Sequence, residues 1–167
     1  MIPCYFKLDK KTRETIDEDG WLHTGDIGLY TTEGCLKIID RKKNIMKIAN
    51  GEYIAPEKIE NVYVTHPMVT EAFIDGKSTE EYIVGFIVPD KKSFMSFAQE
   101  NGQEGTFEAL CKNEEVLAAF HATLKAFCKS KKLHGFEVCK QFKLITTPFE
   151  ELGLQTNSFK LKRNKAR

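Results

Sequence analysis

The turn Thr24–Asp26 places a carboxylate at the start of a short apolar run, where it could bind a ligand. An ionised carboxylate is a strong hydrogen-bond acceptor, and Asp26 could accept from two adjacent hydroxyl groups. A vicinal diol such as the 2′ and 3′ hydroxyls of a ribose fits this chemistry. The alternative is a turn aspartate that accepts a hydrogen bond from its own backbone, and spacing alone favours this alternative.

Cations and a glycine turn follow in the sequence. The run Asp40–Lys43 is joined four residues later by Lys47. Arginine offers a planar fork for phosphate or sugar oxygens, whereas lysine offers a mobile point charge. In the turn Asn50–Tyr53, Gly51 would let the backbone approach a ligand closely because it lacks a side chain. The alternatives are a solvated charge run and an ordinary turn, which are the usual cases.

The C-terminal tail holds five cations in its last eight residues. A lysine in such a tail could place positive charge on a reacting phosphate, where negative charge develops. The alternative is a frayed basic end that binds anions nonspecifically.

Other common chemistries lack their signatures. The five cysteines are odd in number and match no zinc or disulfide spacing, so we expect free, reduced thiols and no metal site. The four histidines have no ligand spacing either, and no nucleophile elbow, P-loop or dinucleotide fingerprint is present.

Composition predicts a soluble globular protein, and the scattered cysteines indicate an intracellular one. Of the 167 residues, 41% are hydrophobic and 29% are charged, which is typical of a folded domain. The net charge of +1 argues against nucleic acid as a partner, since strong nucleic-acid binders carry a basic face. No apolar run approaches the ~18 residues that would span a bilayer, and the N-terminus has no signal segment.

The elements that would position these residues begin with a hairpin. Apolar runs at Ile27–Tyr30 and Leu36–Asp40 flank turn residues, which indicates two antiparallel strands. A short helix or loop is expected at Tyr5–Ile16. A hairpin alone is marginal in water, so residues 1–40 should pack on further protein.

A small α+β domain should follow, at residues 41–167, with a small sheet packed against about three helices. Helical spacing and Pro56 at a first helical position predict helices at 56–66, 93–101 and 114–132. Strands are expected at 69–75, 82–88 and 142–145. From Gly153 onward the pattern becomes polar and basic.

Four segments, taken in order, resemble the adenylate-forming enzymes, and in particular the long-chain fatty acyl-CoA synthetases. They are Gly20–Asp26, Asp40–Lys43, Gly51–Glu60 and Gly153–Arg163. The resemblance runs from about Tyr5 to Arg163. It implies a C-terminal domain preceded by the last hairpin of a large AMP-binding domain, with the hinge at the end of residues 1–40.

The resemblance implies a reaction in two steps. ATP and a long-chain fatty acid give an acyl-adenylate and pyrophosphate, and the thiol of CoA then displaces AMP. The cofactors implied are ATP, with Mg²⁺ held mainly by the missing N-terminal domain, and CoA. Fatty acid, ATP, CoA and that domain are the partners implied.

The resemblance also implies residue roles. Asp26 would bind the ribose hydroxyls with help from Arg41, Asp40 would be the hinge, and Lys160 would stabilise the adenylation transition state. The loop at Gly51 and Glu52 would face the site in the second step. Weaker candidates for nucleotide or CoA contact are Lys43, Lys47 and Tyr53.

The chain departs from the family pattern in three ways. Tyr30 and Thr32 stand where Trp and Pro are common, and Thr156–Ser158 replaces Thr-Pro-Thr before the lysine. The phosphate-gripping loop and the acyl tunnel are absent. We therefore expect the chain to be inactive alone, and any attachment to endoplasmic reticulum, peroxisomal or mitochondrial membranes to lie in the absent part. The alternative is a non-catalytic module that binds a nucleotide, CoA or a protein.

Overall fold

The computed structural model describes residues 4–158 and 160–167. The chain forms two compact units, Met1–Asn44 and Ile45–Arg167. No helix within the described residues is long and apolar enough to cross a membrane.

The first unit consists of a short helix and a hairpin. Helix α1 spans Asp9–Thr15, and strands β1 (Asp26–Tyr30) and β2 (Leu36–Arg41) pair antiparallel, as the sequence predicts. The turn between the strands contains Gly34 at φ +77°, a left-handed backbone conformation that glycine adopts without strain.

The described part of the first unit, residues 4–44, forms no apolar core of its own. Asp40 is the only buried residue among residues 4–44. Large apolar side chains of this unit are exposed instead, including Trp21 at 73%, Tyr30 at 78% and Leu36 at 60%. The expectation that this hairpin packs on further protein agrees with these exposures.

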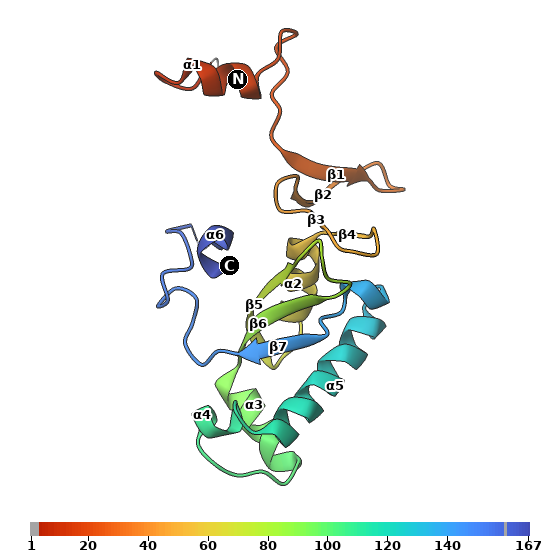
Figure 1. The fold of residues 1–167 in the computed structure, drawn as a ribbon, viewed down its shortest axis with the longest axis vertical. Coiled ribbons are helices and arrows are strands. Elements are labelled where there is room, and N and C mark those ends of the chain that lie inside the picture. Colours follow the sequence, from red (N-terminus) through yellow and green to blue (C-terminus); the bar gives the residue numbers. More distant parts are fainter. Residues whose placement is uncertain (1–3, 159) are drawn as a thin grey trace. The chain divides into compact units, whose positions relative to one another are not determined.

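The second unit is an α+β domain around a three-stranded sheet (Figure 1). Its elements are β3 (Met46–Lys47), β4 (Tyr53–Ile54), α2 (Pro56–Val64), β5 (Val69–Gly76), β6 (Ile83–Pro89), α3 (Lys91–Glu100), α4 (Phe107–Leu110), α5 (Glu114–Ser130), the 3₁₀ turn η1 (Gly135–Glu137), β7 (Gln141–Leu144) and α6 (Arg163–Ala166). Strands β5 and β6 pair antiparallel, and β6 and β7 pair parallel, in the order β5-β6-β7. The predicted fold class and its three longer helices are confirmed.

The main core lies between one face of the sheet and helices α2, α3 and α5. Helical spacing predicts an apolar stripe on α5, and four of its residues, Val116, Phe120, Leu124 and Cys128, are each 0% exposed. The other two, Leu117 and Phe127, are half-buried. The side chain of Asn113 caps α5 by accepting hydrogen bonds from the backbone N–H groups of Glu115 and Val116. Packing of this stripe therefore fixes the helix on the sheet.

A smaller cluster covers the opposite face of the sheet. Because side chains alternate along a strand, Phe73 of β5 points away from the main core. It packs with Val88 and Phe149, and Leu154 and Leu161 of the C-terminal tail lie against them. Figure 1 shows the tail and α6 on the other side of the sheet from α5. The polar and basic pattern after Gly153 therefore does not prevent the tail from packing, since Leu154 and Leu161 are partly buried on this face.

Phe120 gives a direct test of the main core. Its ring makes edge contacts with Phe94 at 5.1 Å and Phe142 at 5.8 Å between centroids. Phe120→Ala should lower the free energy of unfolding by about 3–5 kcal/mol, measured by urea titration of helical circular dichroism. Met95→Ala, at a half-exposed position of α3, is the control and should cost less than about 1 kcal/mol. A loss at Phe120 no greater than the control would contradict this core.

The cysteines give a second test. All five are free; Cys4 and Cys35 are exposed, and the other three are buried. Burial raises the pKa of Cys111 to about 11 and that of Cys139 to about 12, so almost no reactive thiolate forms at about pH 8. A disulfide reagent should therefore modify two thiols rapidly in the native chain and the remainder only in denaturant. Rapid modification of a third thiol would show that the core is open.

Candidate functional site

Asp26 and Arg41 lie side by side on the hairpin. The two residues are register partners on β1 and β2, and Arg41 Nε lies 2.8 Å from Asp26 Oδ1. Arg41 Nη1 also donates to the carbonyl oxygen of Thr24 at 3.1 Å. The guanidinium thus holds both the carboxylate and the turn before it. The structure brings these two predicted site residues together, while their roles stay predictions.

A bulge in the hairpin creates this pairing. The register shifts by one residue between Ile27 and Gly28. If the register of Tyr30 with Leu36 continued without the shift, Asp26 would stand opposite Asp40, and two like charges would face each other. The bulge instead sets Asp26 opposite Arg41. Bulges often re-aim side chains in this way beside functional sites.

Asp40, the predicted hinge, is built into the turn after β2. Its side chain is 1% exposed, and Oδ1 accepts from the Arg41 N–H at 2.6 Å and from Asn44 Nδ2 at 3.2 Å. The Asn44 N–H donates to the Arg41 carbonyl at 2.9 Å, which closes the turn. Lys43 is exposed within it. Arg41 belongs to the first compact unit, which ends at Asn44, and a rotation boundary at residues 40 and 41 stays a prediction.

Lys47, Gly51, Glu52 and Tyr53 share one small ribbon in the second unit. Lys47 pairs with Tyr53 across β3 and β4, and the Lys47 ammonium lies 5.7 Å from the centre of the Tyr53 ring. Gly51 has φ +90°, where a side chain would be strained, and so lets the loop reverse. Tyr53 is 66% exposed. The four candidates therefore form one exposed loop that could contact a ligand.

Lys160 lies on an exposed turn of the tail. The turn is closed by the Thr156 N–H, which donates to the Lys160 carbonyl at 2.9 Å, and by the Lys160 N–H, which donates to Thr156 Oγ1 at 3.1 Å. An isolated bridge between Gln155 and Leu161 continues the pairing. Residue 159 of the predicted lysine motif lies outside the described residues. The Lys160 side chain is exposed to solvent, and a side chain in such a position is free to contact a ligand.

Two charged residues that the sequence reading did not single out anchor this turn. Glu60 of α2 and Arg163 of α6 form an ion pair of which both side chains are almost fully buried. Burial raises the pKa of the Glu60 carboxyl, and the positive charge of Arg163 opposes the rise. A signal was present in the sequence, since Glu60 falls on the buried stripe of α2 with Pro56, Ile59 and Tyr63.

A cavity of about 410 Å³ lies against the sheet, with Phe73, Phe86 and Arg167 among its walls. None of the predicted site residues lines it. The cavity therefore gives no support to the predicted site.

Comparisons with known proteins agree with the fold. The family model described as the AMP-binding enzyme C-terminal domain matches residues 58–143. A solved structure of the adenylation domain of carboxylic acid reductase from Segniliparus rugosus, in complex with AMP and a co-purified carboxylic acid, matches with a TM-score of 0.82 and 28% identity. The match covers 99% of this chain and 24% of that chain.

Curated relatives are similar over almost the whole chain. Long-chain-fatty-acid–CoA ligase 5 of Mus musculus is 49% identical over 160 residues, which is 95% of this chain and 23% of that protein. Long chain acyl-CoA synthetase 6, peroxisomal, of Arabidopsis thaliana is 47% identical over 165 residues, which is 98% of this chain and 24% of that protein. The chain thus spans about a quarter of the length of these relatives.

The resemblance inferred from the four motifs is confirmed by these similarities. Since the matching family model covers residues 58–143 of the 167, the chain belongs to the family of AMP-binding enzyme C-terminal domains.

Proposed function

We propose that this chain is the C-terminal part of a long-chain fatty acid–CoA ligase and is inactive alone. The whole protein would convert ATP, a fatty acid and CoA into acyl-CoA, AMP and pyrophosphate through an acyl-adenylate. The observation that carries the proposal is 49% identity to a long-chain-fatty-acid–CoA ligase across 95% of the chain.

Asp26 and Arg41 would hold the nucleotide in both steps. The Asp26 carboxylate would accept hydrogen bonds from the ribose 2′ and 3′ hydroxyls. Arg41, paired with it at 2.8 Å, would keep the carboxylate oriented and add positive charge beside the sugar-phosphate. The pairing across the hairpin supports this role, because the carboxylate has a fixed direction before a ligand binds.

Lys160 would act in the first step. There the fatty acid carboxylate attacks the α-phosphorus of ATP, a new P–O bond forms, and the bond to pyrophosphate breaks. Negative charge grows on the transferring phosphate and the leaving group, and an ammonium placed there lowers the barrier. Magnesium would accompany ATP and would be held mainly by the N-terminal domain. The exposed position of Lys160 on a closed turn supports such a role.

The loop at Gly51 and Glu52 would act in the second step. The domain would rotate about Asp40, bring this loop to the site and form part of the channel for CoA. The CoA sulfur would then attack the acyl carbonyl carbon, and AMP would leave with the bonding electrons. Exposed Lys47 and Tyr53, and Lys43 of the hinge turn, would contact the nucleotide or CoA.

The large N-terminal domain would be the main protein partner. The exposed apolar residues of the hairpin support this assignment, since a two-stranded hairpin without a core is marginal in water. The protein would act inside the cell. Membrane association would come from that domain, and the peroxisomal relative makes a peroxisomal membrane one candidate.

Mixing experiments test the proposal. The chain alone should form no acyl-CoA from ATP, CoA and palmitate, whereas adding the N-terminal portion of the same protein should restore thioester synthesis. If both folded parts together stay inactive, the catalytic proposal fails. Micromolar binding of ATP or CoA by the chain alone, seen by calorimetry, would then favour the non-catalytic binding module.

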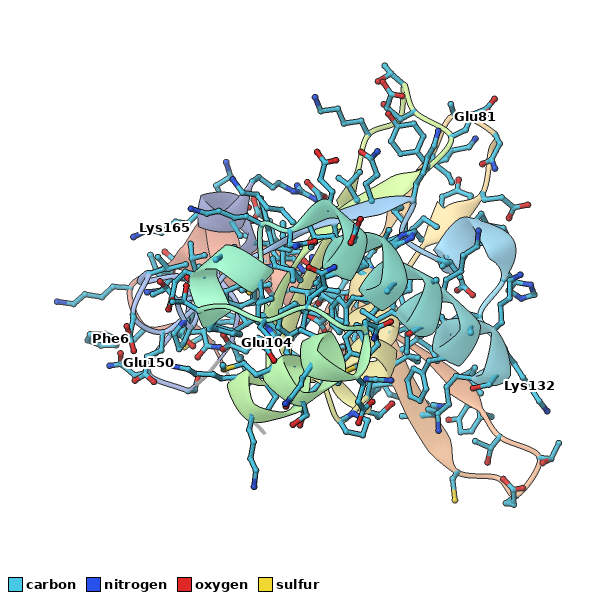
Figure 2. The ribbon with its side chains drawn as sticks, turned by 90° about the horizontal axis from the view of Figure 1, so that it is seen from below. Phe6, Glu81, Glu104, Lys132, Glu150 and Lys165 are labelled. Carbon is cyan, nitrogen blue, oxygen red and sulfur yellow. The ribbon has the colours of Figure 1, made fainter. Side chains whose placement is uncertain are left out.

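Lys160→Ala in the full-length protein tests the assigned step. Adenylate formation should slow by about 10²–10³-fold, because a charge that stabilises the transition state is lost. Thioester formation from a supplied acyl-adenylate should stay near the wild-type rate. Lys165→Ala is the matched control, because Lys165 of α6 points into solvent (Figure 2). Equal losses in the two half-reactions would contradict the role of Lys160.

A further inference from the structure

Strand β5 is the outer strand of the β5-β6-β7 sheet, and its free edge is covered by side chains. The Ile74 N–H donates to Glu60 Oε1 at 2.7 Å, and the Ile74 carbonyl accepts from Arg163 Nη1 at 3.1 Å. Arg163 Nη2 closes the ring by donating to Glu60 Oε2. The carboxylate and the guanidinium thus occupy the place of a further strand, and every partner in the ring is satisfied.

The pair is desolvated as well as hydrogen-bonded. The Glu60 and Arg163 side chains are 11% and 8% exposed, and the guanidinium lies 5.5 Å from the centre of the Phe73 ring. A buried ion pair is weak evidence for stability, because apolar residues of the same volume often do as well. The pair instead fixes the orientation of the Arg163 side chain, because the planar guanidinium can donate to the Glu60 carboxylate and to the Ile74 carbonyl in one orientation only.

The pair fixes one end of the turn that carries Lys160. Arg163 follows Lys160 by three residues, and the Lys162 N–H donates to the Leu154 carbonyl at 2.7 Å. The other end is held by Glu71 of β5, which accepts from Gln155 Nε2 at 2.6 Å. Both ends of the turn are therefore attached to the same strand.

We propose that Glu60 and Arg163 are positioning residues that fix the turn carrying Lys160 to strand β5. The inference rests on the proposed role of Lys160 only for its effect on catalysis. The attachment itself is a property of this chain and can be measured without activity.

Hydrogen exchange of the chain tests the attachment. Arg163→Lys keeps the charge but loses the fork, so the amides of residues 154–162 should exchange about tenfold faster or more, while those of α5 keep their protection. Glu137→Gln is the matched control. Glu137 of η1 is buried and pairs with Lys58 of α2, the helix that also carries Glu60, but this pair does not contact the described residues of the tail. It should leave the tail amides unchanged. Unchanged exchange of 154–162 in Arg163→Lys would overturn the inference.

Rates of the two half-reactions of the full-length protein test whether the attachment matters for adenylate formation. Arg163→Lys and Glu60→Gln should each slow adenylate formation by about tenfold or more, since misplacing a catalytic group by about 1 Å costs rate steeply. Thioester formation from supplied acyl-adenylate should change less than about twofold. A merely structural pair would reduce both half-reactions together, as global loss of the domain does, and that result would overturn the positioning role.

The two proposals fail differently. If Lys160→Ala spares adenylation while Arg163→Lys loosens the tail, the proposed function of the lysine is wrong and the attachment stands. If Lys160→Ala is selective while Arg163→Lys changes neither exchange nor adenylation, the positioning inference is wrong and the role of the lysine stands.

Discussion

The edge of strand β5 is the constraint on which the second unit depends. An outer strand presents backbone donors and acceptors that need partners, and an open edge invites pairing with other chains. Here Glu60 and Arg163 supply those partners from side chains at Ile74, while Glu71 of β5 itself accepts from the Phe149 N–H and from Gln155. A polar, basic tail with little helical or strand propensity is thereby held against the sheet. We infer that the buried ion pair of Glu60 and Arg163 fixes the position of the exposed turn that carries Lys160.

The residues of the first unit are positioned in a different way. The unit's described residues, 4–44, form no apolar core, so its polar residues are placed by backbone register and by short-range hydrogen bonds. One bulge decides that Asp26 meets Arg41 rather than Asp40, and the Asp40 carboxylate is then used to close the following turn. Such a unit needs more protein around it to be stable, which fits a chain that spans about a quarter of its relatives.

Features with a local cause could be predicted from the sequence. The turn before Gly34 defines the hairpin, and Pro56 marks the start of α2. The regular apolar spacing of α5 defines its buried face. Three short elements (α4, η1 and α6) and the two-residue strands β3 and β4 lack a periodic signal, because too few residues are present to show one.

Features with a long-range cause could not be predicted. Order in the tail depends on contacts between residues 89 and 103 positions apart, from Arg163 to Ile74 and to Glu60. The pairing of Asp26 with Arg41 depends on a bulge that turn residues do not reveal. The resemblance to a known family identified Lys160 as a candidate, whereas its supports became visible only with the sheet edge in view.

One measurement tests the central claim most directly: pyrophosphate exchange into ATP, dependent on fatty acid, by the N-terminal portion of the protein with this chain added separately. We expect the wild-type chain to raise the exchange rate and the Lys160→Ala chain to leave it at background. Equal stimulation by both chains would contradict the account, because the chain would then supply structure and not the charge that acts on the phosphate.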